Sequence, residues 1–156
     1  MRPLFRVAAI AVLAAVTLAG CAAPVALEPA ADAVNPQCAE VIVRLPDTLG
    51  TDLALRETNA QGTAAWGNPA AVILRCGVPI PDPTSTLQCV EADGIDWLRD
   101  DTDDPNFVFT TYGRSPAVEV IIDNEVASGA VLFELSAALQ FTTENSRCIG
   151  LEDALG

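Results

Sequence analysis

The residue with the clearest potential for chemistry is Cys21, which ends the stretch Leu18-Ala19-Gly20-Cys21. Lipid transfer to a side chain requires a strong nucleophile, and a cysteine thiol supplies one. Small residues at positions 19 and 20 suit a peptidase that cuts just before the cysteine. The spacing therefore predicts that Cys21 becomes the lipidated first residue of a shorter, mature chain.

The residues before Cys21 have the pattern of an export signal. Arg2 and Arg6 form a basic head, and residues 7–19 carry no charge, which is the order found in signal peptides. As a helix this apolar run would span about 20 Å, against the roughly 30 Å of a bilayer core, so a permanent transmembrane helix is not expected. Together with Cys21 the segment resembles the bacterial lipobox, which predicts a lipoprotein signal peptide over residues 1–20. The alternative is an ordinary signal peptide cleaved beside an incidental cysteine.

Four further cysteines, Cys38, Cys76, Cys89 and Cys148, follow Cys21. An even number in an exported protein predicts two disulfides, for which three pairings exist. We favour Cys76–Cys89, because only twelve residues separate them and the glycine and prolines between them cannot continue a helix or a central strand. Cys38 would then pair with Cys148. The spacings match neither a redox CxxC pair nor a zinc site, so no redox or metal role is expected.

Composition excludes several classes of chemistry. The mature chain would keep all 21 acidic residues but only six arginines, which gives a formal charge of −15. Such a surface repels nucleic acids and anionic lipid head groups, so no nucleic-acid partner is expected. The chain contains neither histidine nor lysine, which removes an imidazole base, a histidine metal ligand and a Schiff-base lysine. No cofactor is expected.

Two pairs of side chains are candidate contacts for a ligand or partner. The guanidinium groups of Arg75 and Arg114 could clamp a carboxylate or phosphate, since the planar fork binds such groups with two parallel hydrogen bonds. Trp66 and Trp97 could line a groove for a sugar or a lipid. The alternatives are internal salt bridges for the arginines and core packing for the tryptophans.

An acidic stretch offers oxygen ligands for a calcium ion. Its carboxylates belong to Asp93, Asp96, Asp100, Asp101, Asp103 and Asp104. Residues 100–104 lack the glycine and the terminal glutamate of an EF-hand loop. A solvated acidic loop is therefore the favoured interpretation, and no metal ligand is assigned.

No catalytic residue is assigned either. Asp96 and Glu119 could act as the two carboxylates of a glycoside hydrolase, yet no spacing selects this pair. Ser115 and Ser136 lack the GxSxG turn of a serine nucleophile, and the chain has no histidine to serve as their base. Catalysis is therefore not the expected function.

The remaining pattern describes one small domain behind a spacer. Residues 21–35 contain two prolines and no apolar period, which predicts a lipidated tether with a reach of up to about 45–50 Å. Residues 36–156 have the length of a single globular domain. Apolar residues at helical spacing predict helices over residues 36–45 and 128–141, although a strand over residues 41–43 stays open.

Short apolar runs between turn residues predict the strands. They are residues 70–76, 87–92, 95–99, 106–112 and 117–123, with residues 53–58 as a further candidate and a loop over residues 63–68. Asp93-Gly94 is a dipeptide typical of a tight hairpin, so the strands on either side of it should pair. The expected fold is an α+β domain with a small antiparallel sheet of about four to five strands and a helix near each end of the domain, the helices covering one face.

Three segments resemble the signatures of a known family. They are Trp66-Gly67-Asn68-Pro69, then Ile73-Leu74-Arg75-Cys76-Gly77-Val78, then the stretch from Tyr112 to Val120. In this order they resemble a lipoprotein family of actinobacteria that is catalogued as a domain of unknown function, number 3515, and the resemblance covers residues 36–148. It implies a location in the cell envelope and implies no activity.

The expected function is that of a lipid-anchored binding or protein-interaction module on the extracytoplasmic face of the cell membrane. Its partners would be the membrane, through the lipid, and an envelope protein. The alternatives are a small carboxylate-dependent hydrolase of envelope glycans and a passive structural lipoprotein. A deep cleft with two carboxylates and an aromatic platform would favour the hydrolase, whereas a shallow apolar patch rimmed by arginine would favour the binding module.

Overall fold

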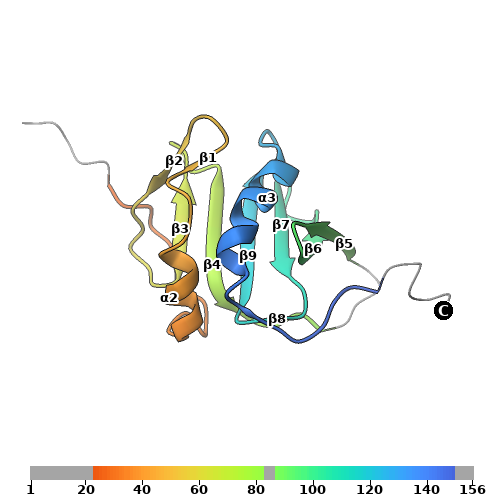
Figure 1. Cartoon of the computed structure of the whole chain (residues 1–156). Coiled ribbons are helices and arrows are strands. Elements are labelled where there is room, and N and C mark those ends of the chain that lie inside the picture. Colours follow the sequence, from red (N-terminus) through yellow and green to blue (C-terminus); the bar gives the residue numbers. More distant parts are fainter. Residues whose placement is uncertain (1–22, 83–86, 150–156) are drawn as a thin grey trace, which may run out of the picture.

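The fold is known from a computed structural model, which describes residues 23–82 and 87–149 (Figure 1). The predicted signal peptide, Cys21 and the last seven residues of the predicted domain lie outside this part of the chain. Within the described residues, neither helix has the length and apolar character that crossing a bilayer requires.

Most of the domain is one antiparallel sheet of eight strands, in the order β1-β2-β3-β4-β9-β7-β6-β5. The strands are β1 (Thr48–Leu49), β2 (Leu53–Arg56), β3 (Thr63–Trp66), β4 (Val72–Val78), β5 (Gln88–Ala92), β6 (Ile95–Asp100), β7 (Asn106–Thr111) and β9 (Ala117–Asp123). Two short strands, β8 (Arg114–Ser115) and β10 (Thr143–Glu144), form a separate antiparallel pair. The sheet consists of two meanders, β1-β2-β3-β4 and β5-β6-β7-β9, which meet where β4 pairs with β9.

The predicted sheet of four to five strands is therefore too small, and the domain is mostly β. Residues 63–68 were expected to form a loop, but their first four residues are β3, in which every residue is buried. A strand buried on both faces does not alternate between apolar and polar residues, so the period of two is missing. The predicted hairpin is confirmed: β5 pairs with β6 around Asp93 and Gly94, which both have positive φ. Strands β7 and β9 are paired in the same antiparallel way.

Two helices lie side by side on one face of the sheet (Figure 1). Helix α2 (Pro36–Ile42) begins at Pro36, and the side chain of Asn35 caps it by accepting a hydrogen bond from the Gln37 amide at 3.0 Å. Helix α3 spans Ser128–Leu139. Both predicted helical segments contain a helix, but α2 ends three residues before Leu45 and α3 ends before Phe141.

The main core lies between this face of the sheet and the two helices. It is built from alternate residues of the central strands, for example Val72, Leu74 and Cys76 of β4, which are all fully buried. On α3 the apolar residues at helical spacing point into the same core. Complete burial of each such aliphatic side chain contributes about 1.5–3 kcal/mol, so the helices are held mainly by this apolar contact.

The disulfides join Cys38 to Cys76 and Cys89 to Cys148. Both pairs that were favoured from the sequence are wrong. Cys76 lies on β4 and Cys89 on β5, and three strands separate them in the sheet. Four strand spacings amount to about 19 Å, whereas a disulfide needs Cα atoms within about 7 Å. Closeness in sequence misleads here because the chain leaves β4 at the middle of the sheet and resumes at its edge.

Residues 23–35, which we call the N-terminal strap, lie against the domain and do not form the free tether that was expected. Val25 makes a parallel bridge with Thr58 just beyond β2. Its N–H donates to the carbonyl of residue 57 at 2.9 Å, and its C=O accepts from the Asn59 N–H at 3.2 Å. The Leu27 N–H donates to Asn59 Oδ1 at 2.7 Å. The strap thus extends the edge of the sheet beside β2.

The second half of the strap packs against the end of β4. Ala30 and Ala33 are buried in a small apolar cluster of their own. The Asp32 N–H donates to the carbonyl of Gly77 at 3.0 Å. A Cβ atom at Gly77 would lie 2.3 Å from the carbonyl carbon of Asp32, so only glycine allows the strap to cross here.

Candidate functional site

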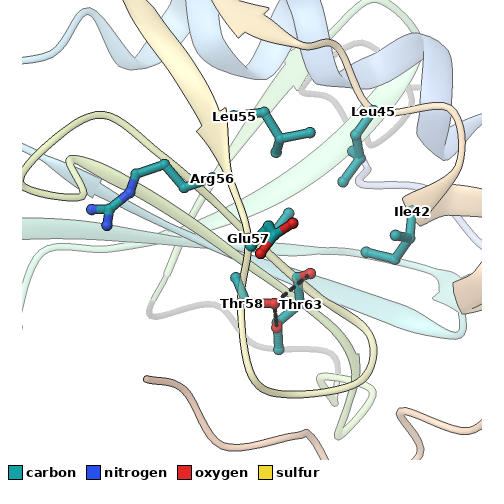
Figure 2. Close-up of a pocket in the computed structure, with 8 residues that line it drawn as sticks. Ile42, Leu45, Leu55, Arg56, Glu57, Thr58 and Thr63 are labelled. Atoms are coloured by element: carbon teal, nitrogen blue, oxygen red, sulfur yellow. Dashed lines mark hydrogen bonds between the residues drawn. The ribbon is translucent and has the colours of Figure 1, made fainter. Parts of the chain in front are cut away.

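The candidate site is a shallow hollow between α2 and the hairpin of β2 and β3, which we call the α2 groove (Figure 2). Its apolar wall consists of Ile42, Leu45 and Leu55. The hollow has a volume of about 290 Å³ and is open to solvent. It is therefore a surface groove into which short side chains would fit.

The fold explains why these apolar side chains remain accessible. Leu55 pairs with Trp66 in the sheet register, so it points to the helix-covered face. Helix α2 ends at Ile42, however, and does not extend over this edge of the sheet. Leu55 stays 38% exposed and Val43, at the end of α2, 75% exposed.

A second hollow of about 370 Å³ continues the α2 groove toward the strap. It shares Ile42, Thr58 and Thr63 with the first hollow and adds Val43 and Ala33. The α2 groove therefore runs along α2 from Leu45 to the strap.

Among the polar side chains of the groove, two threonines bond each other, whereas the carboxylate of Glu57 is accessible to a partner. The Oγ1 atoms of Thr58 and Thr63 are 2.7 Å apart and hydrogen-bond each other. Glu57 points into the groove between the apolar side chains (Figure 2), and its carboxylate has no hydrogen bond or ion pair with another residue of the described chain. Arg56 points away from the groove, where it donates to the carbonyl of Ala23 at 3.0 Å.

The tryptophans proposed as groove residues are core residues instead. Trp66 and Trp97 are both fully buried. The indole N–H of Trp66 donates to the carbonyl of Pro46 at 2.9 Å. Inward-facing positions of the strands place both rings beneath the helices, so neither can form a platform for a sugar or lipid.

The two arginines do not form a clamp, because each has its own internal partners. Arg75 bonds Glu119 on the neighbouring strand at 3.1 Å, with both side chains partly exposed. Arg114 is almost completely buried and donates to the carbonyls of Thr142 and Gly94, each at 3.2 Å, and to Glu144 at 3.0 Å. Its fork thereby joins β8, the turn before β6 and the C-terminal segment.

The carboxylates considered for hydrolysis are also engaged with other groups. Asp96 accepts a hydrogen bond from the Cys148 N–H at 2.8 Å. Glu119 is paired with Arg75. Strand β7 lies between the strands that carry them. Each carboxylate therefore has an internal partner of its own, two strands away from the other.

The acidic loop after β6 uses its carboxylates locally. Asp100 accepts from the Thr102 N–H at 2.9 Å, and hydrogen bonding by the side chain and then the N–H of Thr102 lowers the pKa of the Asp100 carboxyl. Asp101 pairs with Arg99 at 2.6 Å. In the described part of the chain, the only three potential ligand residues whose ligand atoms lie within 4.8 Å of one another are Asp96 and the two cysteines of a disulfide. A disulfide supplies no thiolate ligand, so this cluster does not form a metal site.

The sequence indicated the elements of the α2 groove but not the groove. Ile42 lay in a predicted helix and Leu55 in a predicted strand, so each had an assigned place. What brings them together is the packing of α2 against the edge of the sheet, and no local pattern encodes that contact. The one available signal was the mixed segment Leu55-Arg56-Glu57, in which an apolar residue adjoins two charges.

Comparison with known proteins identifies the family alone. No curated protein and no solved structure matches the chain. A family model described as "Protein of unknown function (DUF3515)" matches residues 2–148, almost the whole sequence. The chain therefore belongs to the DUF3515 family.

Proposed function

We propose that the protein is a lipid-anchored binding module on the extracytoplasmic face of the cell membrane, and that the α2 groove binds a segment of another envelope protein. Two features support the location: the signal-like N-terminus that ends at Cys21, and two disulfides, which persist in oxidising compartments. The resemblance to actinobacterial lipoproteins agrees with it. The anchor would be a thioether on Cys21.

The observation that carries the binding role is the form of the α2 groove. It is shallow and mainly apolar, and it is open along one side. Exposed apolar side chains in a groove of a soluble domain are typical of sites that a partner covers.

The chemistry of the groove indicates the kind of partner. Glu57 places a carboxylate among Ile42, Leu45 and Leu55. A segment that combines apolar side chains with a lysine or arginine would fill the wall and pair with this carboxylate. The formal charge of −15 favours the approach of the same basic partner.

A glycan hydrolase receives no comparable support. The hollow beside β5 and α3 is lined by Glu91 and Asp93 together with Phe133. The register, however, pairs Glu91 with Asp96, so its side chain points to the sheet face opposite α3. Glu91 also accepts a hydrogen bond from Gly94. Its carboxylate therefore cannot act in that hollow.

The binding role is tested with a labelled peptide in which leucine and lysine alternate, measured by fluorescence anisotropy against the folded, oxidised protein. We expect Glu57→Gln to weaken binding about threefold, the effect of losing one partly exposed charge pair. Glu125→Gln, which makes the same change of charge on an exposed loop, is the matched control and should leave binding unchanged.

In cells, a photo-crosslinking residue at Val43 should give a discrete product that Glu57→Arg removes. The same residue at Phe133, which is 60% exposed on α3, should not give that product. Identical products from both positions, or equal effects of the two glutamate variants on peptide binding, would refute the groove as the binding site. A protein that binds nothing at either position would be a passive structural lipoprotein.

A further inference from the structure

We infer that the domain is held directly against the bilayer surface by its strap, so that the sheet edge formed by the strap and residues 57–59, just after β2, lies next to the lipid. This inference rests on the proposed anchor at Cys21. It concerns the distance between the domain and the membrane. A domain on a free tether could reach partners far from the membrane, whereas a domain on a docked strap could reach only partners close to it.

Very few residues are available as a spacer between the lipid and the domain. Ala23 is already in contact with the domain, since its carbonyl accepts a hydrogen bond from the Arg56 guanidinium at 3.0 Å. Only Ala22 stands between Ala23 and Cys21. Two residue steps reach at most about 7 Å. The lipid would therefore be attached within about 7 Å of Ala23.

The strap is held to the domain at several points along its length. Backbone hydrogen bonds fix Val25 beside β2, and the Asp32 N–H is bonded to Gly77. Ala30 and Ala33 are buried. The strap then leads directly into α2, where Cys38 is joined to Cys76 on the central strand. A strap fixed at both ends and in its middle cannot act as a flexible spacer.

The charge of the domain does not favour contact with the membrane. A formal charge of −15 repels anionic head groups, so electrostatic attraction cannot draw the domain to the bilayer. The short connection to the lipid must hold it there instead. The α2 groove includes Thr58, which pairs with Val25 of the strap. Its partner would therefore be a segment that lies close to the membrane surface.

The test measures the distance of two labelled sites from the bilayer. An introduced cysteine can be labelled selectively in the lipidated, oxidised protein, because Cys21 then carries lipid and the other four cysteines are joined in disulfides. Ala54 is exposed on β2, two residues from Arg56 and on the same face of the sheet. Thr102 is exposed just beyond the end of β6, and β6 lies five strand spacings, or about 24 Å, from β2.

Fluorophores on Ala54→Cys and Thr102→Cys are compared in phosphatidylcholine vesicles whose head groups carry a nitroxide quencher. We expect the label at position 54 to be quenched several times more strongly than the label at position 102. A matched variant with twenty glycine and serine residues inserted between Ala22 and Ala23 has a spacer of about 25 Å. Quenching at position 54 should fall in this variant to the level seen at position 102.

The outcomes separate this inference from the proposed anchor. Equal quenching at position 54 with and without the inserted spacer, in protein shown by mass spectrometry to be lipidated, would overturn the docked presentation and leave the anchor intact. A protein that does not float with the vesicles, and whose Cys21 carries no lipid, would overturn both.

Discussion

The two end segments of the domain are fastened to the sheet in the same way but to different depths. The strap crosses β4 at Gly77, next to the disulfide of Cys76. The C-terminal segment, residues 143–149, crosses the chain at Gly113 and ends at the disulfide of Cys148. Both crossings use a glycine with positive φ, on which a Cβ atom would collide with the crossing backbone.

The depth of the two disulfides is the main difference. Cys38 and Cys76 are completely buried in the core between α2 and β4. Cys89 is exposed and Cys148 partly exposed. One bond therefore belongs to the core that supports the strap and the α2 groove, while the other fastens a surface segment. The two disulfides are therefore expected to contribute differently to stability.

Removing the buried disulfide should have the largest effect. Loop closure alone predicts a loss of about 4 kcal/mol for either bond, given sequence separations of 38 and 59 residues. Cys38→Ala with Cys76→Ala also removes two buried sulfur atoms and leaves a cavity. Urea unfolding should therefore show a larger loss for this variant than for Cys89→Ala with Cys148→Ala. Equal losses, or the reverse order, would mean that chain entropy decides and burial does not.

Exposure also predicts the order of reduction. As a reductant is titrated under native conditions, Cys89 and Cys148 should become alkylated first, because their sulfur atoms are the more accessible. Peptide mapping by mass spectrometry measures this directly.

Of the two glycines at the crossings, Gly77 should cost more stability when it is replaced than Gly113. Gly77→Ala places a Cβ 2.3 Å from the backbone of Asp32, which the strap holds in position, and should cost about 3 kcal/mol of unfolding free energy. Gly113→Ala meets the carbonyl oxygen of Ser146 at 1.9 Å, but that residue is exposed and near the end of the described chain, so it can move. About 1–2 kcal/mol is expected there. Gly129→Ala, with nothing within 4 Å in α3, is the control and should not destabilise the protein.

Among the arginines, the larger loss of stability should come from Arg114, which holds the C-terminal segment, because its side chain is buried. Arg114→Ala removes the donor to two backbone carbonyls and one of the two arginines that pair with Glu144, and it should cost about 2 kcal/mol. Arg75→Ala removes a partly exposed pair and should cost less than about 1 kcal/mol. Thermal unfolding of both variants checks this. A larger loss from Arg75 would place the important ion pair on the open face of the sheet.

The smallest expected effect is a loss of stability at acidic pH that depends on Glu144. The hydrogen bond from Arg147, aided by the charges of Arg147 and Arg114, holds the pKa of the Glu144 carboxyl below its usual value. Because its folded pKa is depressed, Glu144 contributes stability above the pKa it has in the unfolded chain and loses it as the pH falls through the folded pKa. The difference in melting temperature between the wild type and Glu144→Gln should shrink over that acidic range. A constant difference would show that Glu144 acts by shape and not by charge.

Local signals were sufficient for much of the fold and little of the site. The turn at Asp93-Gly94 and the helical spacing of α3 depend on neighbours in sequence, and both were predicted correctly. Strand β3 was missed because all its residues are buried. The disulfide pairing failed because it depends on the order of strands in the sheet, which brings Cys89 beside the C-terminal segment and far from Cys76.

The strap and the α2 groove were beyond local reasoning for the same cause. The prolines and small residues of the strap are typical of a spacer, but they are also compatible with an extended edge segment. Which of the two forms depends on the segment just after β2, with which Val25 pairs, and on the glycine at position 77, more than 40 residues away from Asp32 in sequence. Trp66 and Trp97 likewise gave no sign of which face of the sheet they would occupy.

The most direct measurement of the central claim is mass spectrometry of the protein purified from its native membrane, without reduction. We predict that the first residue is Cys21, that it carries a diacylglyceryl thioether, and that the peptides of Cys38 with Cys76 and of Cys89 with Cys148 are joined. An N-terminus without lipid would contradict the proposed location, and free thiols at these four positions would contradict the way in which the end segments are fastened.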